Sequence, residues 1–168
     1  MRYIENSIFI DCEWSMYGEI FLISYKYGFN ETQPIYHNDL FNFPRIIKKL
    51  NPNFIFVFGP DISYIDKFFN EDFRNNFICI NVLTMSRRLI KIDSHKLSSL
   101  ENYLGINREI KKYKENIFNI WEDWNNEFFR EMIIKYNIQD VDSLHTITSY
   151  CIDNFGLTED NILEYRLQ

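Results

Sequence analysis

The sequence predicts one α/β domain over residues 1–168, built on a mixed β-sheet that is flanked by α-helices. Three observations support this fold class: an N-terminal pair of strand-like segments, two short apolar runs that each precede a helical pattern, and a long amphipathic helix near the C-terminus. The 46% apolar content suffices for one sizeable core, and 168 residues are too few for two comfortable domains.

The first third of the chain predicts a three-stranded meander followed by a helix. Residues 7–14 and 18–27 are strand-like and are separated by a short glycine-containing turn, so they predict a hairpin. Residues 33–38 are a candidate third strand. Residues 39–51 predict a helix in their second half, with Pro44 near its start, where proline is tolerated.

The middle of the chain predicts two further strands, each followed by helices. Residues 54–58 form a continuous apolar run, which is typical of a central strand, and the Gly-Pro pair after it opens a helix over 61–70. Residues 77–81 predict another short strand. Two helices follow, at residues 82–91 and 96–106. Gly105 suits the C-terminal end of the second of these helices.

The last third is predicted to be mainly helical. The charged stretch 107–116 predicts a loop or a solvated helix, and residues 125–151 predict one long helix. A meander followed by alternating strands and helices predicts a sheet with both antiparallel and parallel pairs.

Charge and cysteine content exclude several classes of protein. The net charge of −6 has the wrong sign for a protein that holds nucleic acid by bulk electrostatics. The three cysteines are far apart and form no CxxC pair, which predicts neither a disulfide framework nor a zinc site and favours a reducing compartment.

The chain has no feature of a targeting or membrane-spanning segment. Its N-terminus, MRYIENSIF, lacks the apolar core and cleavage pattern of a signal peptide, and no apolar run approaches the roughly 18 residues of a membrane span. We therefore expect a soluble, intracellular (cytoplasmic) protein without membrane contact. The oligomeric state and any protein partner stay open, since an exposed strand edge or aromatic patch would serve a homo-oligomer equally well.

Two carboxylates lie inside the first predicted strand. Because strand side chains alternate between faces, Asp11 and Glu13 point the same way, while Ile10 and Cys12 point the other way into the core. Two anions on one face of a central strand repel each other and are poorly solvated, and a divalent cation would resolve both problems. The alternative is an exposed strand face, on which Asp-x-Glu has no functional meaning.

A third carboxylate lies in the apolar stripe of the long C-terminal helix. One face of that helix carries Phe129, Ile133, Tyr136, Asp140, Leu144, Ile147 and Cys151. The opposite face carries Lys135, Gln139, Asp142 and Thr146. Asp142 is therefore a solvent residue, whereas Asp140 needs a partner and projects together with Tyr136 one turn before it. A hydrogen bond to a core hydroxyl or ring nitrogen is the plain alternative.

A fourth carboxylate opens the helix after the central strand. Asp61 lies on the inward face of that helix, with Ile65, Phe68 and Phe69. Acidic residues are favoured in a first helical turn through capping and the helix dipole, which would by itself explain Asp61. The end of a strand that feeds a helix is also where α/β folds tend to build sites.

These four acids together resemble the motifs of the DEDD superfamily of 3′–5′ exonucleases, which has the ribonuclease H-like fold. The Asp-x-Glu motif matches Asp11 and Glu13, and the motif with an aspartate after a strand and a short glycine-containing turn matches Asp61 in "VFGPDISYI". The third motif, Tyr-x-x-x-Asp, matches Tyr136 and Asp140 in "YNIQDVDSL" and indicates the tyrosine branch.

The resemblance covers roughly residues 7–150 and includes departures. Lys135 occupies the place where the histidine branch has its histidine, and Trp14 follows Glu13 where many relatives carry a small hydroxyl residue. Asp61 lacks the His-Asn or Asn-Gly lead-in of many members, which makes it the weakest motif match. We interpret His37, His95 and His145 as ordinary surface or loop residues.

The resemblance implies a metal-dependent hydrolysis of phosphodiesters at the 3′ ends of single-stranded DNA or RNA. It implies two Mg²⁺ or Mn²⁺ ions about 3.5–4 Å apart. Asp11 would bridge both ions, Glu13 and Asp140 would complete the first site, and Asp61 would hold the second. Tyr136 would orient the attacking water or help to deprotonate it.

Two other functions remain open from sequence. Ribonuclease H-like folds with four acids also serve endonucleases and junction resolvases, and the negative charge is compatible with a catalytically inactive nuclease-fold binding module. Near the motifs, Asn137 would either hydrogen-bond a ligand or face solvent, and we favour solvent. Trp14 would either stack on a base or be a core or rim indole. The basic runs at 87–88 and 111–114 are solvated faces or phosphate contacts.

Overall fold

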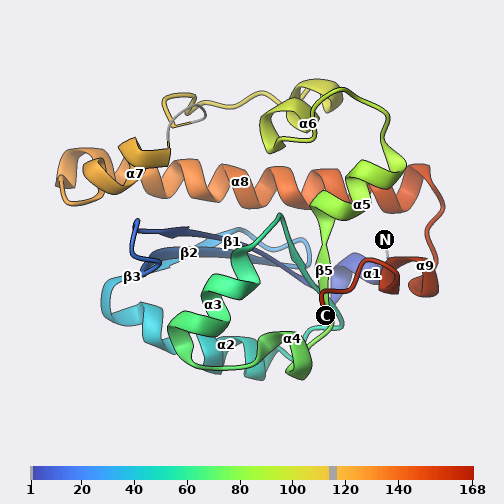
Figure 1. Ribbon diagram of the computed structural model, residues 1–168, viewed down its shortest axis with the longest axis horizontal. Coiled ribbons are helices and arrows are strands. Elements are labelled where there is room, and N and C mark those ends of the chain that lie inside the picture. The colour runs from blue at the N-terminus through green and yellow to red at the C-terminus, as the bar shows by residue number, and fades with distance from the viewer. Residues whose placement is uncertain (1, 114–116) are drawn as a thin grey trace.

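The computed structural model describes residues 2–113 and 117–168 and contains a five-stranded mixed sheet (Figure 1). Its strands are β1 (Ile8–Trp14), β2 (Ile20–Tyr27), β3 (Gln33–Tyr36), β4 (Ile55–Val57) and β5 (Cys79–Asn81). The spatial order is β3-β2-β1-β4-β5, with antiparallel pairs in the β1–β3 meander and parallel pairs from β1 to β4 and from β4 to β5. The predicted hairpin, third strand and mixed sheet are confirmed.

Helices cover both faces of the sheet. They are α1 (Arg2–Glu5), the 3₁₀ helix η1 (His37–Asn42), α2 (Phe43–Leu50), α3 (Asp61–Phe69), α4 (Phe73–Asn76), α5 (Val82–Leu89), α6 (Leu97–Leu104), α7 (Ile117–Trp124), α8 (Glu127–Asn154) and α9 (Glu159–Leu163). Helix α8 crosses one face, with α5, α6 and α7 packed on it, while α2, α3 and α4 lie on the other face (Figure 1).

The alternation of side chains along β1 divides the core into two layers. Ile8, Ile10 and Cys12 are buried against the α2 and α3 side, whereas Phe9 packs with Phe56 against α8. Asp11 and Glu13 alternate with the first group, so the strand turns both carboxylates toward α8.

Helix α8 is the longest element, and its buried stripe lies on the sheet. Asn126 caps its start by accepting a hydrogen bond from the Phe128 backbone N–H, and its 28 residues extend about 42 Å. Ile133, Leu144 and Ile147 have no exposed surface, which confirms the predicted stripe. The helix ends at Asn154, three residues beyond the predicted end at residue 151.

The C-terminal tail, which carries no clear sequence pattern, protects the edge of the sheet. Leu167 N–H donates to the Cys79 carbonyl, and Asn81 N–H donates to the Tyr165 carbonyl. These bonds cover the outer edge of β5, which would otherwise present unpaired backbone groups. No helix of the described residues is long and apolar enough to cross a membrane.

Candidate active site

The strand β1 and the helix α8 bring three of the four predicted carboxylates together. Asp11 and Glu13 come from the C-terminal half of β1, and Asp140 comes from the middle of α8. One oxygen from each of these carboxylates lies within 4.8 Å of the other two. Glu13 and Asp140 are each only 6% exposed. This spacing is compatible with one cation held by oxygen ligands, the donor set that Mg²⁺ and Mn²⁺ prefer.

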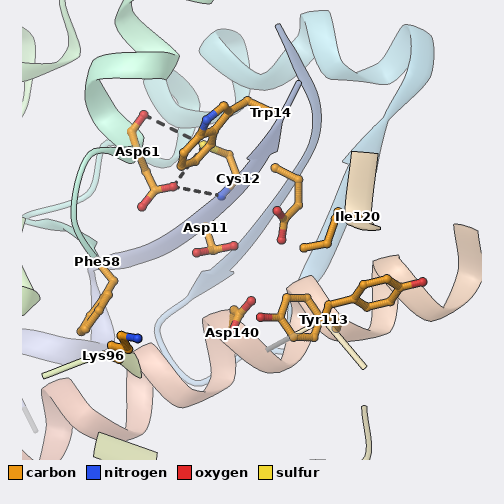
Figure 2. A pocket seen from close by; sticks show the side chains of 11 residues that line it. Asp11, Cys12, Trp14, Phe58, Asp61, Lys96, Tyr113, Ile120 and Asp140 are labelled. Atoms are coloured by element: carbon orange, nitrogen blue, oxygen red, sulfur yellow. Dashed lines mark hydrogen bonds between the residues drawn. The ribbon is translucent and has the colours of Figure 1, made fainter. Parts of the chain in front are cut away.

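Asp61 reaches the same cavity from α3, which lies on the face of the sheet opposite α8. It is the first residue of α3 and is 2% exposed. Its Oδ1 accepts hydrogen bonds from the Cys12 backbone N–H at 3.4 Å and from the Cys12 thiol at 3.2 Å. In Figure 2, Asp11 lies between Asp61 and Asp140. Asp61 therefore lines the same cavity as Asp11 but lies outside the three-carboxylate group.

All five residues that the sequence singled out line one cavity of about 370 Å³. Its walls are formed by Asp11, Cys12, Glu13, Trp14, Phe58, Asp61, Lys96, Tyr113, Ile120, Tyr136 and Asp140 (Figure 2). The cavity is thus lined by acids, one lysine and several aromatic rings. An acidic, ring-lined cavity of this size suits a negatively charged ligand only if cations accompany it.

Burial and mutual repulsion disfavour the charged forms of these acids. Burial, followed by the charges of Asp61, Asp140 and Glu13, holds the pKa of Asp11 well above its usual value. Burial and the charge of Asp140 likewise raise the pKa of Glu13, and burial raises the pKa of Asp61 to about 7. Carboxylates that are destabilised in this way gain from a nearby divalent cation, so the donor set fits the expected ions.

Tyr136 lies next to the carboxylates as a phenol held from two sides. The guanidinium of Arg108 lies over its ring, 4.9 Å from the centroid, and Tyr113 packs edge-on at 5.6 Å. Burial, followed by the charges of Asp140 and Glu13, raises the pKa of Tyr136. The hydroxyl is therefore protonated at neutral pH and acts as a hydrogen-bond donor or acceptor, not as a phenolate base.

Asn137 is part of the site, and the prediction that it faces solvent is wrong. It has no exposed surface, and its Nδ2 donates to Asp11 Oδ2 at 2.6 Å and to Glu13 Oε1 at 3.4 Å. The signal was present in the sequence, since Asn137 lies four residues after Ile133 and three before Asp140, within the same helical stripe.

Arg108 and Glu101 are further buried charges that sequence reasoning missed. Arg108 belongs to the charged stretch predicted to be a loop or a solvated helix. It lies in an irregular segment, yet it is 6% exposed and forms ion pairs with Glu101 and Asp140. Glu101 follows Leu97 and Leu100 on the apolar face of α6, a pattern that resembles the placement of Asp140 in α8. No pattern singles out Arg108. Residues 114–116 of the charged stretch lie outside the described residues.

Two other residues near the site were considered from sequence. Trp14 lines the cavity and stacks on Tyr64 with ring centroids 4.0 Å apart. His145 is half-buried between Phe9 and Phe29, which contradicts its interpretation as an ordinary surface residue.

The two basic runs are largely at the surface. Exposed members of them pair with acids, Arg88 with Glu164 and Lys112 with Asp123. Lys114, the last residue of the second run, lies outside the described residues.

The fold and the site together define a mixed-sheet α/β protein whose central strand and longest helix gather carboxylates into one cavity. The sequence profile of the RNase_H superfamily matches residues 9–152, and the chain belongs to this superfamily. The predicted ribonuclease H-like fold is thereby confirmed. A comparison with curated protein sequences finds no match.

The fold is shared with solved structures of other proteins, among them the two that follow. The chain is similar to the family B DNA polymerase from the hyperthermophilic archaeon Pyrobaculum calidifontis, with a TM-score of 0.67 and 12% identity over 86% of this chain. It spans only 24% of that polymerase. It is also similar to exonuclease X in complex with 5′ overhanging duplex DNA, with a TM-score of 0.53 and 10% identity over 95% of this chain and 98% of that one.

Proposed function

We propose that this protein is a divalent-metal-dependent 3′–5′ exonuclease of the tyrosine branch of the DEDD superfamily. One observation supports this proposal above the others: Asp11, Glu13, Asp61 and Asp140, which are far apart in the sequence, line one cavity together with Tyr136. Membership of the RNase_H superfamily and the fold shared with an exonuclease support the same activity.

The four carboxylates are the proposed ligands of two Mg²⁺ or Mn²⁺ ions. Asp11, Glu13 and Asp140 would hold one ion, and Asp61 with Asp11 would hold the other. When bound, such a pair of ions stabilises the charge on a phosphodiester undergoing in-line attack and favours ionisation of the attacking water. The protein's own contribution is to hold these oxygens in a buried site, where each ion–carboxylate interaction is strong.

Tyr136 and Lys96 are the proposed contacts to the reacting phosphate and water. The protonated Tyr136 hydroxyl would orient the water or donate to a phosphate oxygen, because its raised pKa keeps the proton in place. The Lys96 side chain lines the same cavity and supplies a positive charge to the substrate. Trp14 and Phe58, on the cavity wall, offer ring faces for the terminal bases of a single strand.

The proposal is tested with matched DNA and RNA oligomers labelled at the 5′ end. Single strands, duplexes with a recessed 3′ end and closed circles would be incubated with Mg²⁺ or Mn²⁺. We expect a ladder of products shortened from the 3′ end and no cleavage of the circles. Cleavage of circles would instead indicate an endonuclease or resolvase, and the absence of cleavage of any substrate would favour a binding module.

A pair of variants on one helix separates site chemistry from folding. Asp140→Asn removes a carboxylate that lines the cavity. Asp142→Asn removes a carboxylate outside the cavity, one that accepts hydrogen bonds from Lys26 at 3.0 Å and from Thr32 at 2.7 Å. We expect Asp140→Asn to lower the rate at least about a thousandfold and Asp142→Asn to leave it within about threefold of wild type. Equal activity of wild type and Asp140→Asn would refute the assignment.

A further inference from the structure

A buried chain of charges extends from the cavity into the protein. Arg108 donates through Nη2 to Asp140 Oδ1 and through Nε to Glu101 Oε1, and the Ser143 hydroxyl donates to the same Glu101 oxygen at 2.7 Å. The side chains of Arg108 and Glu101 are 2% and 0% exposed. The guanidinium is enclosed further by the Tyr136 ring. A permanent positive charge is thus fixed against a carboxylate of the candidate metal site.

We propose that Arg108 is an internal counter-cation of the acidic cluster, which stabilises the ion-free protein and weakens divalent-ion binding at Asp140. The proposal rests on the metal site of the proposed function and adds a residue that controls ion affinity. Glu101 is the positioning residue that holds the guanidinium in place and partly offsets its charge.

The geometry explains why Arg108 opposes an ion and does not merely fill space. One of its nitrogens already bonds to Asp140 Oδ1, and an oxygen of Asp140 is one of the three that lie within 4.8 Å of one another. An ion held by those three oxygens would therefore lie close to a fixed positive charge in a poorly solvated site. Like charges at such short range repel strongly when water does not screen them.

The surroundings prevent Arg108 from moving away when an ion arrives. Its second bond, to Glu101, lies deeper in the protein, and Glu101 is itself held by Ser143. Leaving that place would break the ion pair between Arg108 and the buried Glu101, which is strongly unfavourable. Arg108 therefore remains beside Asp140 in the ion-bound protein, and its repulsion is a lasting reduction in affinity.

The same arrangement explains how the ion-free cluster stays folded. Without cations, Arg108 compensates Asp140, and Asn137 bridges Asp11 and Glu13 through its Nδ2. Both donors act where the carboxylates would otherwise only repel one another. Arg108 thereby raises the stability of the protein at low ion concentration and lowers its affinity for ions.

The test measures Mn²⁺ binding by isothermal titration calorimetry on substrate-free protein. In the double variant Arg108→Met/Glu101→Gln both buried charges are absent, and we expect about tenfold tighter Mn²⁺ binding than in wild type, because the nearer, positive charge is removed. In Glu101→Gln alone the charge of Arg108 is no longer offset, and we expect binding several-fold weaker than in wild type. The two changes in opposite directions would not arise from a merely structural role.

A matched control removes an ion pair elsewhere. Lys48→Met/Glu71→Gln deletes a pair at 2.8 Å on the other side of the sheet and should leave Mn²⁺ affinity within about twofold of wild type. Urea unfolding in EDTA accompanies each titration, to show that each variant is folded.

Unchanged or weaker binding in the folded double variant overturns the proposal. If the double variant does not fold, unchanged or tighter Mn²⁺ binding by Glu101→Gln is by itself enough to overturn the proposal. Absence of Mn²⁺ binding in wild type and both variants also overturns it, since Arg108 would then oppose no ion. If the protein is a metal-dependent nuclease but its Mn²⁺ affinity does not depend on Arg108, this inference is refuted and the proposed function stands. If the Mn²⁺ affinities change as predicted but the protein has no nuclease activity, the proposed function is refuted and this inference stands.

Discussion

Replacing Asp61 by asparagine should change the stability of the ion-free protein in a pH-dependent way. Asp61 is 2% exposed, and its burial raises its pKa to about 7, against 3.8 for an ordinary aspartate. Asparagine keeps an oxygen that accepts the hydrogen bonds from Cys12 but carries no charge at any pH. The substitution therefore isolates the free-energy cost of ionising this position.

The magnitude follows from the two pKa values. Because the folded-state pKa of Asp61 is raised, the folded protein holds a proton that the unfolded chain has lost between about pH 4 and pH 7. The stability contributed by Asp61 is therefore lost as pH rises through this window, and this contribution is constant above it. Each pH unit costs about 1.4 kcal/mol, so wild type should lose about 2–3 kcal/mol between pH 5 and pH 8 that Asp61→Asn does not lose.

Urea unfolding in EDTA at pH 5 and pH 8 measures this difference directly. Asp142→Asn, whose half-exposed carboxylate pairs with Lys26, is the control for loss of a single negative charge. Millimolar Mg²⁺ at pH 8 should raise the stability of the wild-type protein and should raise that of Asp61→Asn less, because the ion offsets a negative charge that the variant lacks. A free-energy difference between Asp61→Asn and wild type that is constant within about 0.5 kcal/mol from pH 5 to pH 8 would refute the reasoning.

Three further predictions follow from other sites. Burial, followed by the nearby charge of Lys26, lowers the pKa of His145 to about 4. As pH falls below about 6.5, the unfolded chain therefore binds a proton at His145 that the folded protein does not bind. Between pH 7 and pH 5, wild type should therefore lose about 1 kcal/mol more than His145→Gln, a value reduced for partial exposure; equal losses would contradict this. In Gly28→Ala the new methyl group would lie 2.5 Å from the Glu5 carbonyl oxygen at φ +55°, and urea unfolding should show a loss of about 1–3 kcal/mol. Tyr136→Phe should lower the cleavage rate about 10–100-fold with Mn²⁺ affinity unchanged, and a fall in affinity instead would make the hydroxyl a ligand.

The fold was largely predictable because its elements have strong local patterns. The alternation along β1 and the stripe along α8 each repeat over several residues, so burial overrides single-residue preferences. Helices α1, α4, α7 and α9 were not predicted. Three of them have only four or five residues, which are too short to show a period, and α7 has only eight. The tail that pairs with β5 lacks a strand pattern, and only the tertiary structure brings it to that edge.

The candidate site was predictable where a polar residue interrupts an apolar pattern. Asp140 was found because it stands in the buried stripe of α8, and the same criterion would have found Asn137 and Glu101 had it been applied to every polar residue. Arg108 follows no such criterion. It lies in an irregular segment, where burial depends on which partners the fold supplies and not on a repeat in the chain.

The charge balance of the cavity links ion binding to substrate binding. Arg108 and Glu101 together add no net charge, although Arg108 lies nearer the cluster. The net charge that Asp11, Glu13, Asp61 and Asp140 leave is therefore about −4 when all are ionised. A phosphodiester is itself an anion, and Lys96 alone does not offset such a cluster. One divalent ion would leave half of that charge, and two would neutralise it. If the cavity is the proposed nuclease site, ions should therefore be needed for the substrate to enter it as well as for hydrolysis. Substrate affinity should then depend on Mg²⁺ or Mn²⁺ even in a variant that does not cleave.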